Sequence, residues 1–231
     1  MSAGLQSATG TSPRPDVLGE LLHSLSQPLT SLRCSLELSI DGAAERQHES
    51  VSFALQQTEK VIGMVELMRE YLDAQQPLLR SYSTPIAPVL KTLIEDLSSA
   101  AEVRGVTVRF VGNSTATLPV PRVQLRLALQ YLMAALIEAQ PSPSHVGVLL
   151  GQGPAGTVLR AEVERSHPNE SASSALQPQA PPVPESLSTL RRARLAIARR
   201  VLEGSGASLL IDDGTPFGFA LRIPRPEDGV L

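Results

Sequence analysis

The stretch LLHSLSQPLTSLR, from Leu21 to Arg33, governs the architecture because it places a histidine, His23, beside a regular row of leucines. The leucines follow one another in alternating steps of four and three residues, a spacing that forms a continuous apolar stripe on a helix. This row, called the leucine stripe below, consists of Leu18, Leu22, Leu25, Leu29, Leu32 and Leu36. His23 falls one residue away from the stripe. We therefore expect its imidazole at the edge of the packed surface and open to solvent, where the neutral ring can act as a nucleophile.

A second helix, predicted over residues 45–74, carries a matching apolar row after the turn residues Asp41 and Gly42. Its members are Ala54, Thr58, Val61, Val65, Met68 and Leu72. Two such helices with a short connection predict an antiparallel hairpin. A single hairpin leaves much of this apolar surface in water, whereas two hairpins that share it form a four-helix bundle. We therefore expect a homodimer, with packing on the rest of the chain as the alternative cover.

The composition of the 231 residues is that of a globular protein, with 42% hydrophobic residues and a net charge of −3. An acidic balance and only 3% aromatic residues argue against a nucleic-acid surface. Cys34 is the single cysteine, which excludes an intrachain disulfide. The longest apolar stretch, residues 125–139, is interrupted by polar side chains and is too short to span a bilayer. The first residues show no signal-peptide pattern, so we expect a cytoplasmic protein without membrane contact.

The chain divides by composition into three regions. Residues 1–15 are rich in Ser, Gly, Thr and Pro and predict a disordered tail, residues 16–82 the helical hairpin, and residues 83–231 an α/β region. In the last region we expect a turn at 151–156, a proline-rich loop at 166–186, helices at 89–104, 122–139 and 187–203, and strands at 106–111, 146–150, 158–163, 208–211 and 219–223. Strands mixed with helices in this way predict a two-layer sandwich with the helices on one face, so the whole chain is α+β.

The order of these parts resembles the catalytic core of two-component sensor histidine kinases, and the likeness covers nearly all of the chain beyond the tail. The family's histidine box is matched by His23, Gln27, Pro28 and Leu29. The acid that usually follows the histidine is replaced by Ser24, and Glu20, one turn earlier on the same helix face, is a candidate to take its place. The resemblance implies that His23 accepts a phosphoryl group and passes it to a response-regulator receiver domain. Gln27 faces the same side and is a candidate to contact that group.

The nucleotide-binding boxes of the family are altered in this sequence. On the helix that resembles the asparagine box, the two expected asparagines fall at Tyr131 and Ala135, which offer no carboxamide oxygen to Mg²⁺. Residues 164–170 stand in place of the Asp-x-Gly-x-Gly box. Arg192 and Arg194 replace glycines that would let the backbone approach phosphate. Residues 218–224 resemble the closing strand of the family. We expect no bound cofactor.

This combination resembles the histidine phosphotransferases, which keep a dimeric hairpin and a degenerate ATPase-like domain and relay phosphate between two receiver domains. It is the main hypothesis for the function. One alternative is an ATP-dependent sensor histidine kinase with divergent boxes. Another is a non-catalytic dimeric scaffold that binds signalling partners through the same bundle.

Other polar groups carry weaker signals. The remaining histidines, His48, His145 and His167, show no ligand spacing, so no metal site is expected. Five arginines in the last helix predict a solvated helix face, or alternatively a dock for an acidic receiver surface: Arg191, Arg192, Arg194, Arg199 and Arg200.

Overall fold

The structure is a computed structural model that describes residues 17–41, 44–76, 82–154, 156–163, 185–212 and 217–225. The elements follow one another as α1 (Val17–Asp41), α2 (Ala44–Asp73), β1 (Thr84–Pro85), α3 (Ile86–Val103), β2 (Val106–Gly112), β3 (Thr117–Leu118), α4 (Arg122–Glu138), β4 (Ser144–Gly153), β5 (Gly156–Val163), α5 (Glu185–Gly204), β6 (Ser208–Asp212) and β7 (Gly218–Ile223). The predicted tail, and the predicted loop as far as the start of α5, lie outside the described residues. The division into domains at residues 82–83 stays a prediction.

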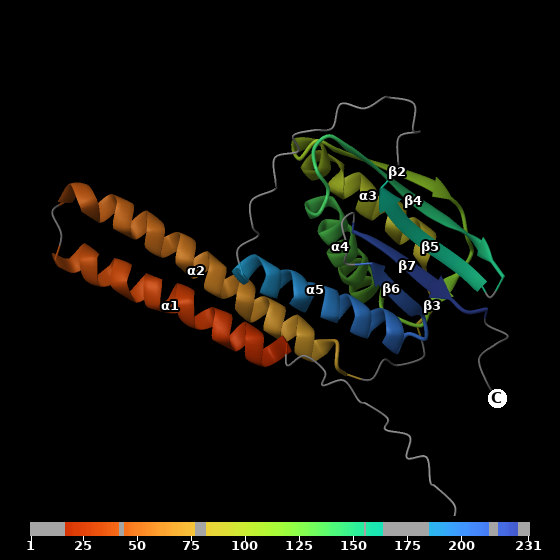
Figure 1. Cartoon of the computed structure of the whole chain (residues 1–231). Coiled ribbons are helices and arrows are strands. Elements are labelled where there is room, and N and C mark those ends of the chain that lie inside the picture. Colours follow the sequence, from red (N-terminus) through yellow and green to blue (C-terminus); the bar gives the residue numbers. More distant parts are fainter. Residues whose placement is uncertain are drawn as a thin grey trace, which may run out of the picture.

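The first two helices form the predicted hairpin, which extends well beyond the rest of the molecule (Figure 1). The side chains that are buried along the hairpin, called the closed face below, are a different set from the leucine stripe, namely Val17, Leu21, Pro28 and Ser35 on α1 and Ala54, Gln57, Met64 and Leu67 on α2. The Ser35 hydroxyl also donates a hydrogen bond of 2.6 Å to the carbonyl of Ser50.

The leucine stripe lies beside this closed face and remains open. Leu18, Leu25 and Leu32 are half-buried, and Leu22, Leu29 and Leu36 are exposed. As expected for a single hairpin, the stripe thus remains partly in contact with water.

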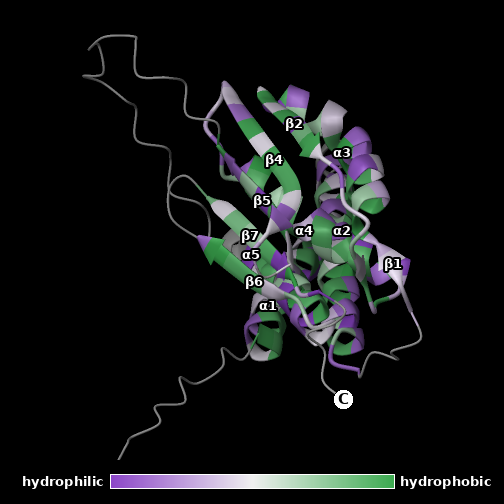
Figure 2. Cartoon of the chain, turned by 90° about the vertical axis from the view of Figure 1, so that its right-hand side faces the viewer, coloured by the Kyte–Doolittle hydropathy of each residue, from purple (hydrophilic) through white to green (hydrophobic). Residues whose placement is uncertain are grey.

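The α/β region is the predicted two-layer sandwich. In the described part of the chain, five strands form one mixed sheet in the order β2-β4-β5-β7-β6. Strands β2 and β4 run parallel, and the other neighbours run antiparallel. Helices α3, α4 and α5 all lie on one face of this sheet, as Figures 1 and 2 show. The predicted α+β fold class is confirmed.

The core lies between the sheet and these helices. Helix α4 is its centre, with Leu125, Ala128, Leu129, Leu132, Met133, Ala135, Leu136 and Ile137 buried. Strand β7 alternates in the manner of a half-buried strand and turns Phe219, Leu221 and Ile223 inward. Helix α5 lies between the hairpin and α4 and contacts both, so it connects the two parts of the molecule (Figure 1).

Two details differ from the sequence-based expectations. The turn predicted at 151–156 is much tighter, because β4 and β5 remain paired up to Gly153 and Gly156. Gly156 has φ +127, and a Cβ there would come within 2.1 Å of the Ile223 carbonyl oxygen, so only glycine fits this corner. The short pair β1–β3 was not predicted; it joins Thr84 to Leu118.

Candidate functional site

His23 lies on α1 at the point where the hairpin meets α5. Its side chain is exposed, as the sequence predicted. Within the described residues no hydrogen bond or ion pair engages the imidazole. The neighbouring Ser24 hydroxyl donates to the carbonyl of Glu20 at 2.9 Å and is committed to the helix backbone.

The candidate Glu20 is paired with a residue from the other end of the chain. Its two carboxylate oxygens contact both terminal nitrogens of Arg192 on α5, at 3.3 and 3.4 Å. Two contacts of this kind give the fork geometry typical of arginine–carboxylate recognition. Glu20 therefore connects the helix that bears His23 to the α/β region.

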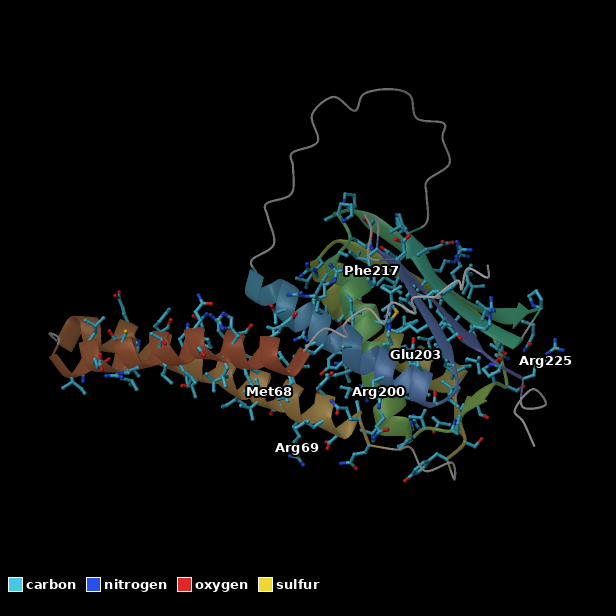
Figure 3. The ribbon with its side chains drawn as sticks, turned by 60° about the horizontal axis from the view of Figure 1, so that its bottom comes forward. Met68, Arg69, Arg200, Glu203, Phe217 and Arg225 are labelled. Atoms are coloured by element: carbon cyan, nitrogen blue, oxygen red, sulfur yellow. The ribbon has the colours of Figure 1, made fainter. Side chains whose placement is uncertain are left out.

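Glu20 also lines a cleft of about 690 Å³ between the open end of the hairpin and α5. The hairpin supplies Val17, Tyr71 and Gln75 to its wall, and α5 supplies an arginine-rich side that includes Arg200. Figure 3 shows Arg200 and Glu203 on α5 near the hairpin. Arg199 is paired with Glu203 at 3.8 Å.

The candidate Gln27 lies at a second cleft, of about 490 Å³, on the other side of His23 along α1. Polar groups from four helices meet there: Ser24, Gln27 and Ser31 of α1, Gln57, Lys60, Glu66 and Glu70 of α2, Tyr131 of α4 and Arg194 of α5. Gln27 is exposed, and no described residue hydrogen-bonds to its amide. The structure thus places the three predicted site residues along one side of α1, with His23 between two clefts rather than inside one.

The positions that resemble nucleotide boxes contain other contacts. The Tyr131 hydroxyl donates a hydrogen bond to the carboxylate of Glu70 on α2. Burial, reinforced by this bond, raises the pKa of Tyr131 well above its ordinary value, so the hydroxyl keeps its proton. Arg194 lies over the Tyr131 ring at 5.8 Å and 3.9 Å from the carboxylate of Glu138.

These contacts do not suit a nucleotide with its metal ion. Ala135, at the second expected asparagine position, is buried in the core and carries no polar group. Tyr131 is engaged by α2, and Arg194 fills space beside α4 where a glycine would leave the backbone open. Residues 164–170 lie outside the described part. Across the residues that are described, no cluster of His, Cys, Asp or Glu is arranged to hold a metal ion.

The arginines of α5 are not simply a solvated face. Arg191 lies over the Phe217 ring at 4.8 Å and is half-buried, as is Arg194. The expectation is wrong for these two because neighbouring aromatic rings attract guanidinium groups. Glu70, which receives the Tyr131 hydrogen bond, was not singled out from the sequence. Nothing in the sequence distinguishes it from the other acids of α2.

Comparison with known proteins identifies the fold. No protein-family model matches the sequence, and no curated protein does so either. Among solved structures, the histidine kinase AdeS of Acinetobacter baumannii is 15% identical, with 88% of this chain and 98% of that chain covered and a TM-score of 0.63. The histidine kinase ThkA, in its complex with the response regulator protein TrrA, is 13% identical, with 94% of this chain and 63% of that chain covered and a TM-score of 0.65.

None of the helices in the described ranges is both long and apolar enough to cross a membrane. The two likenesses extend over most of this chain, across both the helical hairpin and the α/β region. The chain therefore has the fold of a sensor histidine kinase core, a helical hairpin joined to an ATPase-like sandwich.

Proposed function

We propose that this protein is a dimeric, cytoplasmic histidine phosphotransferase that relays phosphoryl groups between response-regulator receiver domains through His23. The observation that carries the proposal is the exposed, unengaged imidazole of His23 on the hairpin of a histidine kinase fold. The side chains at the resembling nucleotide positions, Tyr131 and Arg194, bind other parts of the chain instead. The likeness to ThkA, whose structure contains a response regulator, supports a receiver domain as the partner.

The transfer needs little from the protein beyond position. A ring nitrogen of neutral His23 attacks the phosphorus of an aspartyl phosphate on the receiver, and the bond from phosphorus to the carboxylate oxygen breaks. The aspartate leaves as a carboxylate with the electron pair, and the remaining N–H proton of the imidazole passes to water. In-line alignment and neutralisation of the phosphoryl charge account for most of the acceleration in such reactions. In this proposal a magnesium ion held by the receiver would neutralise the charge, and Gln27 would contact the phosphoryl oxygens.

The proposed dimer forms through the leucine stripe. Leu22, Leu29 and Leu36 are exposed in the single chain at seven-residue spacing, which is the arrangement that packs against a second hairpin. The two copies of His23 would then stand on the outside of the bundle, because His23 does not share the stripe's face of α1.

The test is a transfer assay with receiver domains that have been phosphorylated by radiolabelled acetyl phosphate and freed from the reagent. We expect acid-labile label on the wild-type chain and none on His23→Gln. The matched control is His48→Gln, which removes another exposed histidine of the same hairpin and should keep the label. Equal labelling of His23→Gln and wild type would refute the assignment. Receiver binding without label on any variant would favour the scaffold instead.

A further inference from the structure

Two polar contacts join the hairpin to the α/β region across long stretches of sequence. Arg192 on α5 contacts the carboxylate of Glu20 on α1 through both of its terminal nitrogens, and these residues are 172 positions apart in the chain. Tyr131 on α4 donates to Glu70 on α2, from 61 positions away. Both acceptors are carboxylates, and hydrogen bonds to ionised acceptors are stronger than neutral ones. Each helix of the hairpin is thus held by a different helix of the α/β region.

Arg194 links the two contacts. It lies two residues after Arg192 on α5, and two residues correspond to about 200° of rotation around a helix. Arg192 accordingly points to α1, while Arg194 points to α4, where it lies over the Tyr131 ring and approaches Glu138. Helix α5 is therefore joined to α1 through Arg192 and to α4 through Arg194.

The two contacts are shielded from water to different degrees, and the better shielded one is the less sensitive to salt. The Tyr131 hydroxyl is partly buried, which limits the access of water to its hydrogen bond with Glu70. The Glu20–Arg192 pair is more open, with 57% of the arginine side chain exposed, so salt screens it more strongly. The two contacts therefore differ in kind: the Tyr131–Glu70 hydrogen bond is partly sheltered from water, and the Glu20–Arg192 ion pair is exposed.

We propose that Arg192 and Tyr131 form a clasp that docks the α/β region onto the hairpin of the same chain, with Glu20 and Glu70 as its receiving groups and with Arg194 packed over the Tyr131 ring. The clasp holds the α/β region at one orientation beside His23. Tyr131, Arg192 and Arg194 occupy positions that correspond to nucleotide-binding boxes in the resembling family. In this chain the surface that they form contacts the hairpin of the same chain. This inference concerns the arrangement of one chain and does not depend on the proposed phosphotransfer.

The experiment measures the distance between the two parts directly in the full chain. One spin label is attached to Cys34, the exposed cysteine of α1, and a second to Leu210→Cys on the exposed face of β6. Labelled protein is diluted with an excess of unlabelled wild type, so that each dimer contains at most one labelled chain. Double electron–electron resonance then reports the distribution of distances within a chain. We expect one narrow peak.

The clasp is opened by combining Arg192→Glu with Tyr131→Phe, which should broaden the peak at least twofold. Arg126→Glu is the matched control, because it reverses the charge of an equally exposed arginine that pairs with Asp96 at 2.9 Å inside the α/β region. This control should keep the narrow peak. Far-ultraviolet circular dichroism confirms that each variant is folded.

A charge swap provides the second arm of the test. Arg192→Glu alone places two carboxylates together and should broaden the peak, and Glu20→Arg in the same chain should narrow it again. The clasp is disproved if the combined Arg192→Glu and Tyr131→Phe chain keeps the wild-type distribution. It is equally disproved if the charge swap remains as broad as Arg192→Glu. No receiver domain is present in this experiment, so a failure of the proposed phosphotransfer leaves its outcome unaffected.

Discussion

The carboxylate of Glu20 on α1 lies 3.3 Å from the guanidinium of Arg192 on α5, one helical turn before His23. This pair brings the α/β region to the edge of the candidate site. Gln27, one turn after His23, borders a cleft that also contains Tyr131 and Arg194. In the proposed transfer, a receiver domain at His23 would meet side chains from both parts of the chain, since each cleft beside His23 is lined by the hairpin and by α5.

Replacement of Gln27 by alanine should slow phosphoryl transfer about tenfold without lowering the unfolding temperature. The amide is exposed and free of described partners, so its loss removes a contact to the phosphoryl group and nothing from the fold. A lost hydrogen bond to a charged group costs about 1.5–3 kcal/mol, which corresponds to tenfold or more in rate. Rapid-quench transfer assays measure the effect, with Gln56→Ala on α2 as the control. An unchanged transfer rate would remove Gln27 from the site.

The dimer should dissociate when the leucine stripe is charged. Leu29→Glu places a carboxylate in the middle of the surface that two hairpins are proposed to share, where each buried leucine contributes about 1.5–3 kcal/mol. Sedimentation at micromolar concentration should show a dimer for wild type and a monomer for the variant. Leu210→Glu, which charges an exposed leucine of β6, should remain dimeric. A monomeric wild type would contradict the expectation.

Magnesium and ATP together should leave the unfolding temperature unchanged. A ligand that binds only the folded state at one hundred times its dissociation constant adds about 2.7 kcal/mol of stability, which is readily seen in a thermal scan. We expect no such gain because Tyr131 and Ala135 provide no metal ligand and Arg194 lies against α4. A rise in the unfolding temperature that saturates with ATP concentration would instead support the kinase alternative.

The stability of the protein should fall at alkaline pH through Tyr131. Burial and the Glu70 hydrogen bond raise the pKa of this tyrosine in the folded state, so folding favours the protonated form. The resulting stabilisation is complete below the pKa of an unfolded tyrosine, about 10, and is lost as the pH rises from there towards the higher pKa of the folded state. Urea unfolding between neutral and alkaline pH should show a steeper decline for wild type than for Tyr131→Phe. Tyr82→Phe, at an exposed position, should follow the wild-type curve.

The core of the α/β region should depend on α4. Leu132 is fully buried there, and Leu132→Ala should lower the free energy of unfolding by about 2–5 kcal/mol, since a cavity remains after the side chain is removed. Val123→Ala on the same helix removes an exposed side chain and should change it by less than about 0.5 kcal/mol. Chemical denaturation monitored by circular dichroism compares the two. Similar values for both variants would show that α4 is not the centre of the core.

Local patterns were enough to predict the long elements of this protein. Helices α2 and α4 begin and end within a residue or two of the predicted positions, because apolar spacing and turn residues are properties of neighbouring positions in the chain. The β1–β3 pair escaped prediction because each strand has only two residues, and its partner lies far away in the sequence. Which side chains of α1 are buried in the hairpin was not predicted, because periodicity alone does not show which face of a helix meets its neighbour.

The histidine, its neighbours along one side of α1 and the succession of helices and strands could all be read from the order of residues, since they depend on helical geometry and short-range spacing. The contacts of Glu20 with Arg192 and of Glu70 with Tyr131 could not be predicted from the sequence. Those contacts exist because packing between distant segments brings α5 against the hairpin and α4 against α5, and polar side chains carry no local signal of the partner that they will meet.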